Sequence, residues 1–162
     1  MLIGLPGSGK STWRQANQYF IGSSIESAVV ISSDDLIEKF GRENGLNYSE
    51  AFKAVDQKEI EKQVREMFLQ AHQDESDIII DRTNMSRKVR RSWLSGLPKT
   101  YEREAIVFQV EPDVLAIRLA RRHEATGKFI PPGVVESMRN AYEEPVLSEG
   151  FNVIKLFPQA QS

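Results

Sequence analysis

The stretch Gly4-Leu5-Pro6-Gly7-Ser8-Gly9-Lys10-Ser11-Thr12 decides the fold of this chain. It matches the pattern G-x-x-x-x-G-K-[ST] of a phosphate-binding loop. In such a loop, backbone N–H groups curl around the phosphates of a nucleotide, and glycines let the backbone come close. The helix that follows directs unpaired N–H groups and its dipole at the same anion. We therefore expect a nucleoside triphosphate, ATP or another, to be bound by Gly7, Ser8, Gly9, Lys10, Ser11 and Thr12.

Two residues of the loop have specific expected roles. Lys10 reaches the β- and γ-phosphates, and the Ser11 hydroxyl ligates Mg²⁺. An apolar run, residues 1–3, leads into the loop, and a helix-compatible run, residues 12–20, leads out of it. Since only three residues precede the loop, the first strand is short for a central strand, which is consistent with a native chain that begins a few residues earlier.

The composition limits the classes of protein that this chain can belong to. Its 162 residues predict one domain spanning 1–162, with enough chain to bury one core. The sequence contains no cysteine, which excludes disulfides and thiolate metal sites and is compatible with a reducing cytoplasm. It shows no apolar run of membrane-spanning length and no signal peptide. We expect no membrane partner and a cytoplasmic location, which for a phage-encoded protein is the host cytoplasm.

Strand and helix signals alternate along the chain. Further apolar runs predict strands at 28–31, 77–80, 105–110 and 152–156. These runs are nearly continuous in apolar residues, as is typical of strands buried in a parallel sheet. Together with the phosphate loop after the first strand, they predict an α/β protein: a three-layer α/β/α domain with a five-stranded, mostly parallel sheet.

Capping residues and prolines predict where the intervening helices begin and end. The expected features are Ser49 as N-cap of one helix continuing to about residue 71, Ser86 as N-cap of a helix through 94, Pro112 in a first turn, and a last helix opened by Pro131-Pro132 and stopped by Pro145.

The second predicted strand ends at Ser32-Ser33-Asp34-Asp35. Ligands of open parallel sheets bind beyond the carboxyl ends of the strands. A kinase needs a carboxylate there to accept the proton of the attacking hydroxyl, and we favour Asp34 as this base, with Asp35 nearer the helix cap. The alternative is that both acids only complement the start of a helix, with Ser32 and Asp35 forming a capping box.

The third predicted strand ends at Asp81-Arg82-Thr83-Asn84. We expect Asp81 to hold Mg²⁺, usually through water, although an ordinary strand-end turn is the alternative. Residues 82–91 carry five basic side chains and no acid, whereas residues 33–75 carry eleven acids against six bases. This basic run predicts phosphate contacts, unless it is a solvated helix face. The expected substrate-binding residues are Asp34, Asp35, Arg82, Thr83, Asn84 and Arg87.

Arg118 and Arg122 follow the fourth predicted strand and share one helix face, because they are four residues apart. A polar segment with one glycine, 123–130, comes next and is typical of a mobile lid. We expect a lid at roughly 118–131 whose arginines stabilise the transferring phosphoryl group. The alternative is a basic helix end that faces solvent and complements the helix dipole.

Taken together, these motifs resemble the 5′-kinase domain of bacteriophage polynucleotide kinase and its RNA-repair relatives. The resemblance implies a P-loop kinase fold with a helical lid, ATP and Mg²⁺ on Lys10 and Ser11, Asp34 as base on a polynucleotide 5′-hydroxyl, and lid contacts from Arg118 and Arg122. The matching pieces run in the same order over nearly the whole chain: 4–13, Asp34-Asp35, Asp81-Arg82-Thr83-Asn84, Arg118 with Arg122, and Pro131, Val134, Met138 and Pro145.

The sequence departs from the family pattern at Ile37, where the phage enzyme has an arginine that binds the acceptor's phosphate, and in a longer loop before Pro131. The leading hypothesis is an ATP-dependent kinase acting on 5′-hydroxyl ends of RNA or DNA. A small-molecule kinase acting on a nucleoside, sugar or antibiotic is the alternative, and Ile37 favours it. A non-catalytic nucleotide-binding module is a third hypothesis. The expected catalytic residues are Lys10, Asp34, Arg118 and Arg122.

Overall fold

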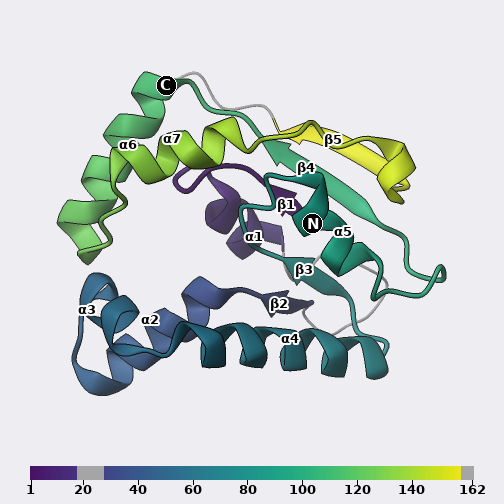
Figure 1. Ribbon diagram of the computed structural model, residues 1–162, viewed down its shortest axis with the longest axis horizontal. Coiled ribbons are helices and arrows are strands. Elements are labelled where there is room, and N and C mark those ends of the chain that lie inside the picture. Colours follow the sequence, from purple (N-terminus) through teal and green to yellow (C-terminus); the bar gives the residue numbers. More distant parts are fainter. Residues whose placement is uncertain (18–27, 158–162) are drawn as a thin grey trace.

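The computed structural model describes residues 1–17 and 28–157 of the chain. Strands and helices alternate along these residues, as the sequence predicted (Figure 1). Every strand pairing that they contain is parallel, which confirms the mixed α/β class. The strands are β1 (Leu2–Ile3), β2 (Val29–Ile31), β3 (Ile78–Ile80), β4 (Glu104–Phe108) and β5 (Val153–Phe157).

The strands form two sheets rather than one. One sheet has the order β1-β4-β5, and the other pairs β2 with β3. A single parallel bridge, between Leu2 and Asp81, joins them, and the Gly4 N–H next to it donates to the Thr83 carbonyl at 3.0 Å. The prediction of a five-stranded sheet is therefore wrong. Strand β1 has only two residues, both paired with β4, and is too short to make a regular ladder with β3 as well.

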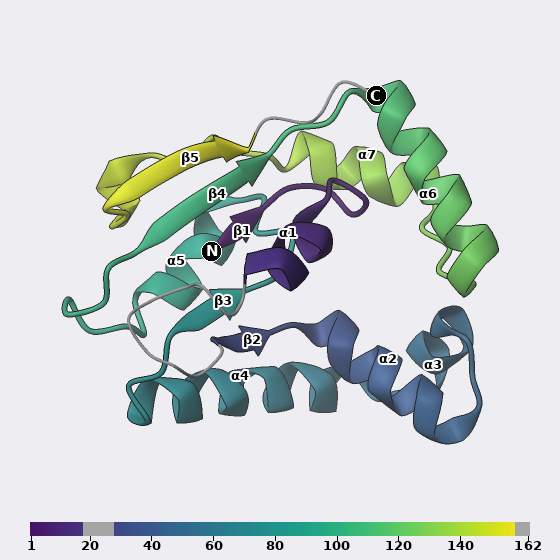
Figure 2. The ribbon, with the colours of Figure 1, turned by 180° about the vertical axis from the view of Figure 1, so that it is seen from behind.

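Helices cover both faces of this strand array, as Figure 2 shows from behind. Because side chains alternate along a strand, Leu2, Ile79 and Ile106 point to one face, where Trp13 of α1 (Lys10–Asn17) packs on them. The opposite face packs against α4 (Gln57–Gln73) and α5 (Arg87–Leu94), through Val64, Phe68, Trp93 and Leu94 among others. The helix–sheet–helix layering expected from the sequence is present.

Several helix starts agree with the sequence prediction. Ser32 caps α2 (Ser33–Asn44) by accepting a hydrogen bond from the Asp35 N–H. Ser86 caps α5 in the same way through the Val89 N–H, and Pro112 is the first residue of α6 (Pro112–Thr126). Residues 18–20 of the predicted first helix lie outside the described residues.

The predicted long helix from Ser49 is wrong. Two helices stand in its place, α3 (Tyr48–Ala54) and α4, with Val55 extended between them and Asp56 capping the second through the Lys58 N–H. The cap of α3 is Asn47, which forms a reciprocal capping box with Glu50. The last helix, α7 (Pro132–Asn140), also ends earlier than Pro145, and a short 3₁₀ helix η1 (Leu147–Glu149) follows it.

The helices beyond the strand ends come together from two sides. Both views place the end of α6 beside α3, although more than sixty residues separate them in the sequence (Figures 1 and 2). The Ser49 hydroxyl joins them by donating to the Gly127 carbonyl at 2.5 Å. None of the helices in the described residues is long and apolar enough to cross a membrane.

Candidate active site

A cavity of about 1910 Å³ lies beyond the strand ends, between the phosphate loop, α2, α3, α6 and the segment before α7. It brings together most of the site residues predicted from the sequence. Ser8, Asn84 and Arg87 are not among its lining residues. The predicted residues that line it are Gly7, Gly9, Lys10, Ser11, Thr12, Asp34, Asp35, Asp81, Arg82, Thr83, Arg118 and Arg122.

The phosphate loop depends on glycine for its shape. Gly7 and Gly9 have φ angles of 79° and 101°, in the region that other residues rarely adopt. A Cβ atom at Gly7 would also stand 3.2 Å from Leu115 and 3.1 Å from Leu119 of α6. The loop therefore packs closely under α6, which places the predicted lid helix directly beside the predicted phosphate site.

Lys10 begins α1 and is buried, with 8% of its surface exposed. Its Nζ donates to the carbonyls of Gly4 and Leu5, at 2.8 Å each. Burial lowers the pKa of Lys10 to about 8, although the nearby Asp81 and Asp34 carboxylates oppose this shift. The Lys10 side chain thus folds back onto its own loop.

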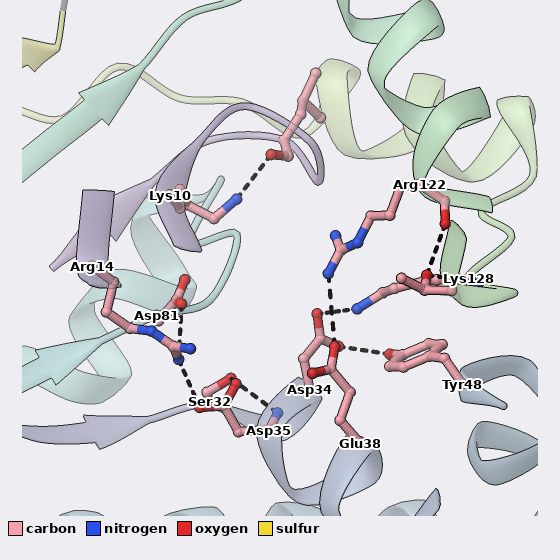
Figure 3. Close-up of polar contacts among 12 residues, drawn as sticks. Lys10, Arg14, Ser32, Asp34, Asp35, Glu38, Tyr48, Asp81, Arg122 and Lys128 are labelled. Carbon is pink, nitrogen blue, oxygen red and sulfur yellow. Dashed lines mark hydrogen bonds and ion pairs between the residues drawn. The ribbon is translucent and has the colours of Figure 1, made fainter. Parts of the chain in front are cut away.

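Asp34, the predicted base, is held by two side chains from other parts of the chain (Figure 3). Its Oδ1 accepts a hydrogen bond from the Tyr48 hydroxyl at 2.6 Å, and its Oδ2 pairs with Lys128 Nζ. Burial raises the pKa of Asp34, but the Lys128 charge and both hydrogen bonds outweigh it and hold the pKa below its usual value. The Asp34 carboxyl is therefore ionised at neutral pH.

Lys128 and Tyr48 form the support of this carboxylate, and the sequence analysis missed both. Lys128 has 4% of its side chain exposed, and its Nζ lies 3.8 Å from the centre of the Tyr48 ring, a cation–π contact. Burial, together with the Asp34 charge, raises the pKa of Tyr48, so its hydroxyl stays a donor. No local pattern connects residues 94 positions apart; the only signal was the position of Lys128 in the predicted lid.

Asp35 lies in a different network from its neighbour. Its Oδ2 pairs with Arg14 at 2.7 Å, and the same arginine reaches Asp81 at 3.2 Å. Ser32 also donates to Asp35 Oδ1 at 3.2 Å, so Asp35 belongs to the helix cap, as the sequence suggested. Arg14 was missed, and the available signal was its position four residues after Lys10 on the same face of α1.

Ser11 and Asp81 are the residues that could hold a metal ion. Both line the cavity, and burial raises the pKa of Asp81, opposed by the charges of Arg14 and Lys10. Among the described residues, no group of three or more acidic or histidine side chains is placed to hold a metal by itself. One hydroxyl and one carboxylate nevertheless fit Mg²⁺, which typically keeps several waters and binds substrate phosphates.

Of the basic residues in the run 82–91, only Arg82 lines the cavity, and Arg87 does not. The phosphate contacts expected of these two arginines stay a prediction. Arg82 makes two hydrogen bonds to Glu61, at 2.8 and 2.6 Å. Arg90 is fully buried and bonds both carboxylate oxygens of Glu149 at 2.8 Å. Arg87 is exposed and is not among the residues that line the cavity.

Asn84 is buried and supports the fold, whereas the sequence predicted that it binds substrate. It is buried in a left-handed conformation, with φ of 50°, and its Nδ2 donates to the Leu2 carbonyl at 2.7 Å. This bond crosses from the end of β3 to β1, the two strands joined by the single bridge. Asn84 therefore connects the two sheets beneath the site, and it does not line the cavity where a substrate would bind.

Arg118 and Arg122 reach the cavity from α6, as their spacing predicted. Arg122 lies 3.8 Å from Glu38 across the cavity. The predicted lid, 118–131, is helical as far as Thr126 and then turns at Gly127 with φ of 71°. Its end is docked on α3, because Ser49 Oγ donates to the Gly127 carbonyl and accepts from the Phe129 N–H at 3.4 Å.

A phosphate loop, an ionised carboxylate facing it and two arginines on an adjacent helix define a phosphotransferase of the P-loop kinase class. A family model described as "AAA domain" matches residues 1–145. The chain belongs to that family. The predicted resemblance to a P-loop kinase of the polynucleotide kinase type is confirmed by this match and by a solved relative.

Two solved structures show the same fold. A chain of the Pnkp1/Rnl/Hen1 RNA repair complex is 26% identical, with a TM-score of 0.63, over 86% of this chain and 42% of that one. This protein therefore spans less than half the length of that relative. A gluconokinase from Sinorhizobium meliloti 1021 is 17% identical, with a TM-score of 0.55, over 99% of this chain and 82% of that one, and shows likeness of fold alone.

Proposed function

We propose that this protein is an ATP-dependent kinase that transfers the γ-phosphate to 5′-hydroxyl ends of RNA or DNA. One observation carries the proposal: Asp34 faces the same cavity as Lys10 and Ser11, and Lys128 and Tyr48 hold it ionised. A module that only binds nucleotides has no need of such a carboxylate. The similarity to a chain of an RNA repair complex supports a polynucleotide as the acceptor.

The donor, ATP or another nucleoside triphosphate, binds at the phosphate loop. The N–H groups of residues 7–12 surround its phosphates, and Lys10 exchanges the Gly4 and Leu5 carbonyls for phosphate oxygens. Arg118 and Arg122 contact the same phosphates from α6. Ser11 and Asp81 would hold Mg²⁺, which would supply positive charge to offset that of the donor phosphates.

The transfer step then uses Asp34. The oxygen of the acceptor's 5′-hydroxyl forms a bond to the γ-phosphorus, the bond from that phosphorus to the β–γ bridging oxygen breaks, and ADP leaves. Asp34 accepts the hydroxyl proton, since each of its oxygens keeps a second lone pair beside its bond to Tyr48 or Lys128. Arg118 and Arg122 stabilise the charge that spreads over the phosphoryl oxygens.

A small-molecule kinase remains the second candidate because of Ile37. This residue has 2% of its surface exposed and packs in the core with Ile31 and Val64. The helix position at which the phage enzyme carries its acceptor-binding arginine therefore faces the interior here, and it supplies no charge to the acceptor. A nucleoside, sugar or antibiotic without phosphates would not need that charge.

Incubation with γ-labelled ATP and a panel of acceptors tests the proposal. We expect label on RNA or DNA oligonucleotides with a 5′-hydroxyl and none on the same oligonucleotides already carrying a 5′-phosphate. The Asp34→Asn variant serves as the matched control for contaminating kinases. Label found on nucleosides, sugars or antibiotics, and not on oligonucleotides, would overturn the proposal in favour of a small-molecule kinase.

A further inference from the structure

A polynucleotide acceptor needs cations for its own phosphates, and the basic run 82–91 contributes only Arg82 to the cavity lining, where it is already paired with Glu61. Two other cations line the cavity: Arg42, in the last turn of α2, and Lys53, in the last turn of α3. Both are exposed, and neither makes a hydrogen bond or ion pair with another residue in the part of the chain that is described. They are available to an anionic ligand in the cavity.

An exposed aromatic ring lies beside Lys53. Phe52 lines the cavity with 47% of its surface exposed, although an aromatic ring of this size is usually buried. It stacks on Tyr48, with 6.1 Å between ring centres and 29° between planes. Lys128 already covers the Tyr48 ring. Phe52 is thus the ring of this pair that offers open surface to a ligand.

These residues extend outward from the reacting carboxylate. Tyr48 is bonded to Asp34 and stacked on Phe52, so Phe52 is one ring away from the catalytic base. Helices α2 and α3 pack closely there, since a Cβ atom at Gly41 would stand 3.2 Å from that of Ala51. This packing keeps Arg42, the residue after Gly41, on the same side of the cavity as α3.

We propose that Arg42, Phe52 and Lys53, here called the α3 wall, bind the 5′-terminal segment of a single-stranded polynucleotide. An unpaired base stacks on Phe52, and phosphates beyond it contact Arg42 and Lys53. Stacking on an aromatic ring requires an unpaired base but tolerates any base, so the acceptor is a single strand of unrestricted sequence. The inference rests on the proposed kinase function and assigns its acceptor site to α3.

The acids near the α3 wall are engaged elsewhere. Glu50 accepts from the Asn47 N–H at 2.8 Å in the capping box, and Glu38 lies 3.8 Å from Arg122. Neither is paired with Arg42 or Lys53. The two cations therefore keep their net attraction for phosphate, and that attraction falls as salt rises.

The test is equilibrium binding of a 5′-hydroxyl single strand, labelled at its 3′ end, to purified variants. We expect Phe52→Ala to weaken binding roughly ten- to hundred-fold and Phe52→Trp to restore it. Arg42→Ala and Lys53→Ala should each reduce the slope of log affinity against log salt by about 0.7. KM for ATP should not change. The matched controls are Leu69→Ala and Lys58→Ala, both exposed and outside the cavity, and we expect neither to affect binding.

Two results would overturn the α3 wall while leaving the kinase function in place. One is a wild-type protein that phosphorylates oligonucleotides, with Phe52→Ala, Arg42→Ala and Lys53→Ala behaving like the controls. The other is binding of a blunt duplex as tight as that of the single strand, because its bases cannot stack on Phe52. If the wild type neither binds nor phosphorylates any 5′-hydroxyl strand, the proposed function itself fails. Circular dichroism verifies that each variant is folded.

Discussion

Asp34 and Asp35 are adjacent in sequence but face different partners, and this separates their expected roles. We predict that Asp34→Asn lowers kcat by about 10²–10⁴-fold, because the amide cannot accept the proton. Asp35→Asn keeps the cap by its backbone N–H and weakens only the Arg14 contact, so its effect should be smaller. Single-turnover transfer of γ-labelled phosphate measures both. The reverse ranking would show that Asp35 is the base.

Lys128 sets the pH at which Asp34 loses its proton. Burial alone raises the pKa of Asp34, and Lys128 is the largest of the influences that bring it below the usual value. In Lys128→Met, only the Tyr48 hydrogen bond and the Arg122 charge still oppose the effect of burial, so the acid limb of kcat/KM should move up by roughly 1–3 pH units. Lys128→Arg keeps the charge and should leave the limb near its original pH. An unchanged limb in Lys128→Met would mean that Asp34 is not the titrating base.

The residue roles that were missed share one physical cause. The loop residues and Asp34 could be predicted because each lies at the end of a recognisable strand, where parallel sheets bind ligands. The contacts of Asp34 with Tyr48 and Lys128 arise only when α3 and the end of α6 meet in space. Arg90 shows the opposite error. As part of the basic run 82–91, it was expected to be available to phosphates, but its charge is paired with the buried Glu149 side chain.

At the scale of elements, local sequence signals correctly predicted where several helices begin, but hydrophobic spacing did not predict where one helix ends and the next begins. Ser32, Ser86 and Pro112 start helices because capping and proline geometry are local effects. Hydrophobic spacing continued across Val55, so α3 and α4 read as one helix. The pairing of Asn47 with Glu50 was a visible capping box that would have placed the start of α3.

Arg90 joins α5 to η1 and gives a prediction at this scale. It bonds Glu149 and the carbonyls of Asn84 and Met85 from a fully buried position. We predict that Arg90→Met lowers the free energy of unfolding by roughly 3–5 kcal/mol, because Glu149 is left without its partner. Urea unfolding followed by circular dichroism measures the change. Arg91→Ala, exposed on the same helix, is the control and should cost little. Equal effects would contradict the structural role of Arg90.

At the scale of the molecule, the site is divided between two sheets. The phosphate loop follows β1 in one sheet, whereas Asp34 and Asp81 follow β2 and β3 in the other. One bridge, the hydrogen bond from the Gly4 N–H to the Thr83 carbonyl and the Asn84 bond connect them. The prediction of a single five-stranded sheet failed at the contact between β1 and β3. The apolar runs indicate where strands occur, but they do not show how many residues of each strand pair with a neighbour. Strand β1 has only two residues, which is too few to form a regular ladder with β3 as well.

A nucleotide bound across both sheets should stabilise the whole fold. We predict that ATP with Mg²⁺ at about 100 times its Kd adds roughly 2.7 kcal/mol, a rise in Tm of about 5–10 °C. Lys10→Ala should fold normally, lose the shift at the same ATP concentration and lose phosphoryl transfer. Differential scanning fluorimetry and the γ-phosphate assay measure these. A full Tm shift in Lys10→Ala, or near-native turnover, would refute the assignment of the phosphate loop.

The buried Lys128 amine also allows opening of the lid to be measured by chemical modification. Its side chain is shielded by Tyr48 and by the docking of Gly127 on Ser49, and burial lowers its pKa more than Asp34 raises it. An amine-reactive acylating reagent can therefore modify Lys128 only when the end of α6 leaves α3 and exposes the amine to solvent. The rate of Lys128 acylation, followed by peptide mass spectrometry, should therefore report how often the end of α6 leaves α3.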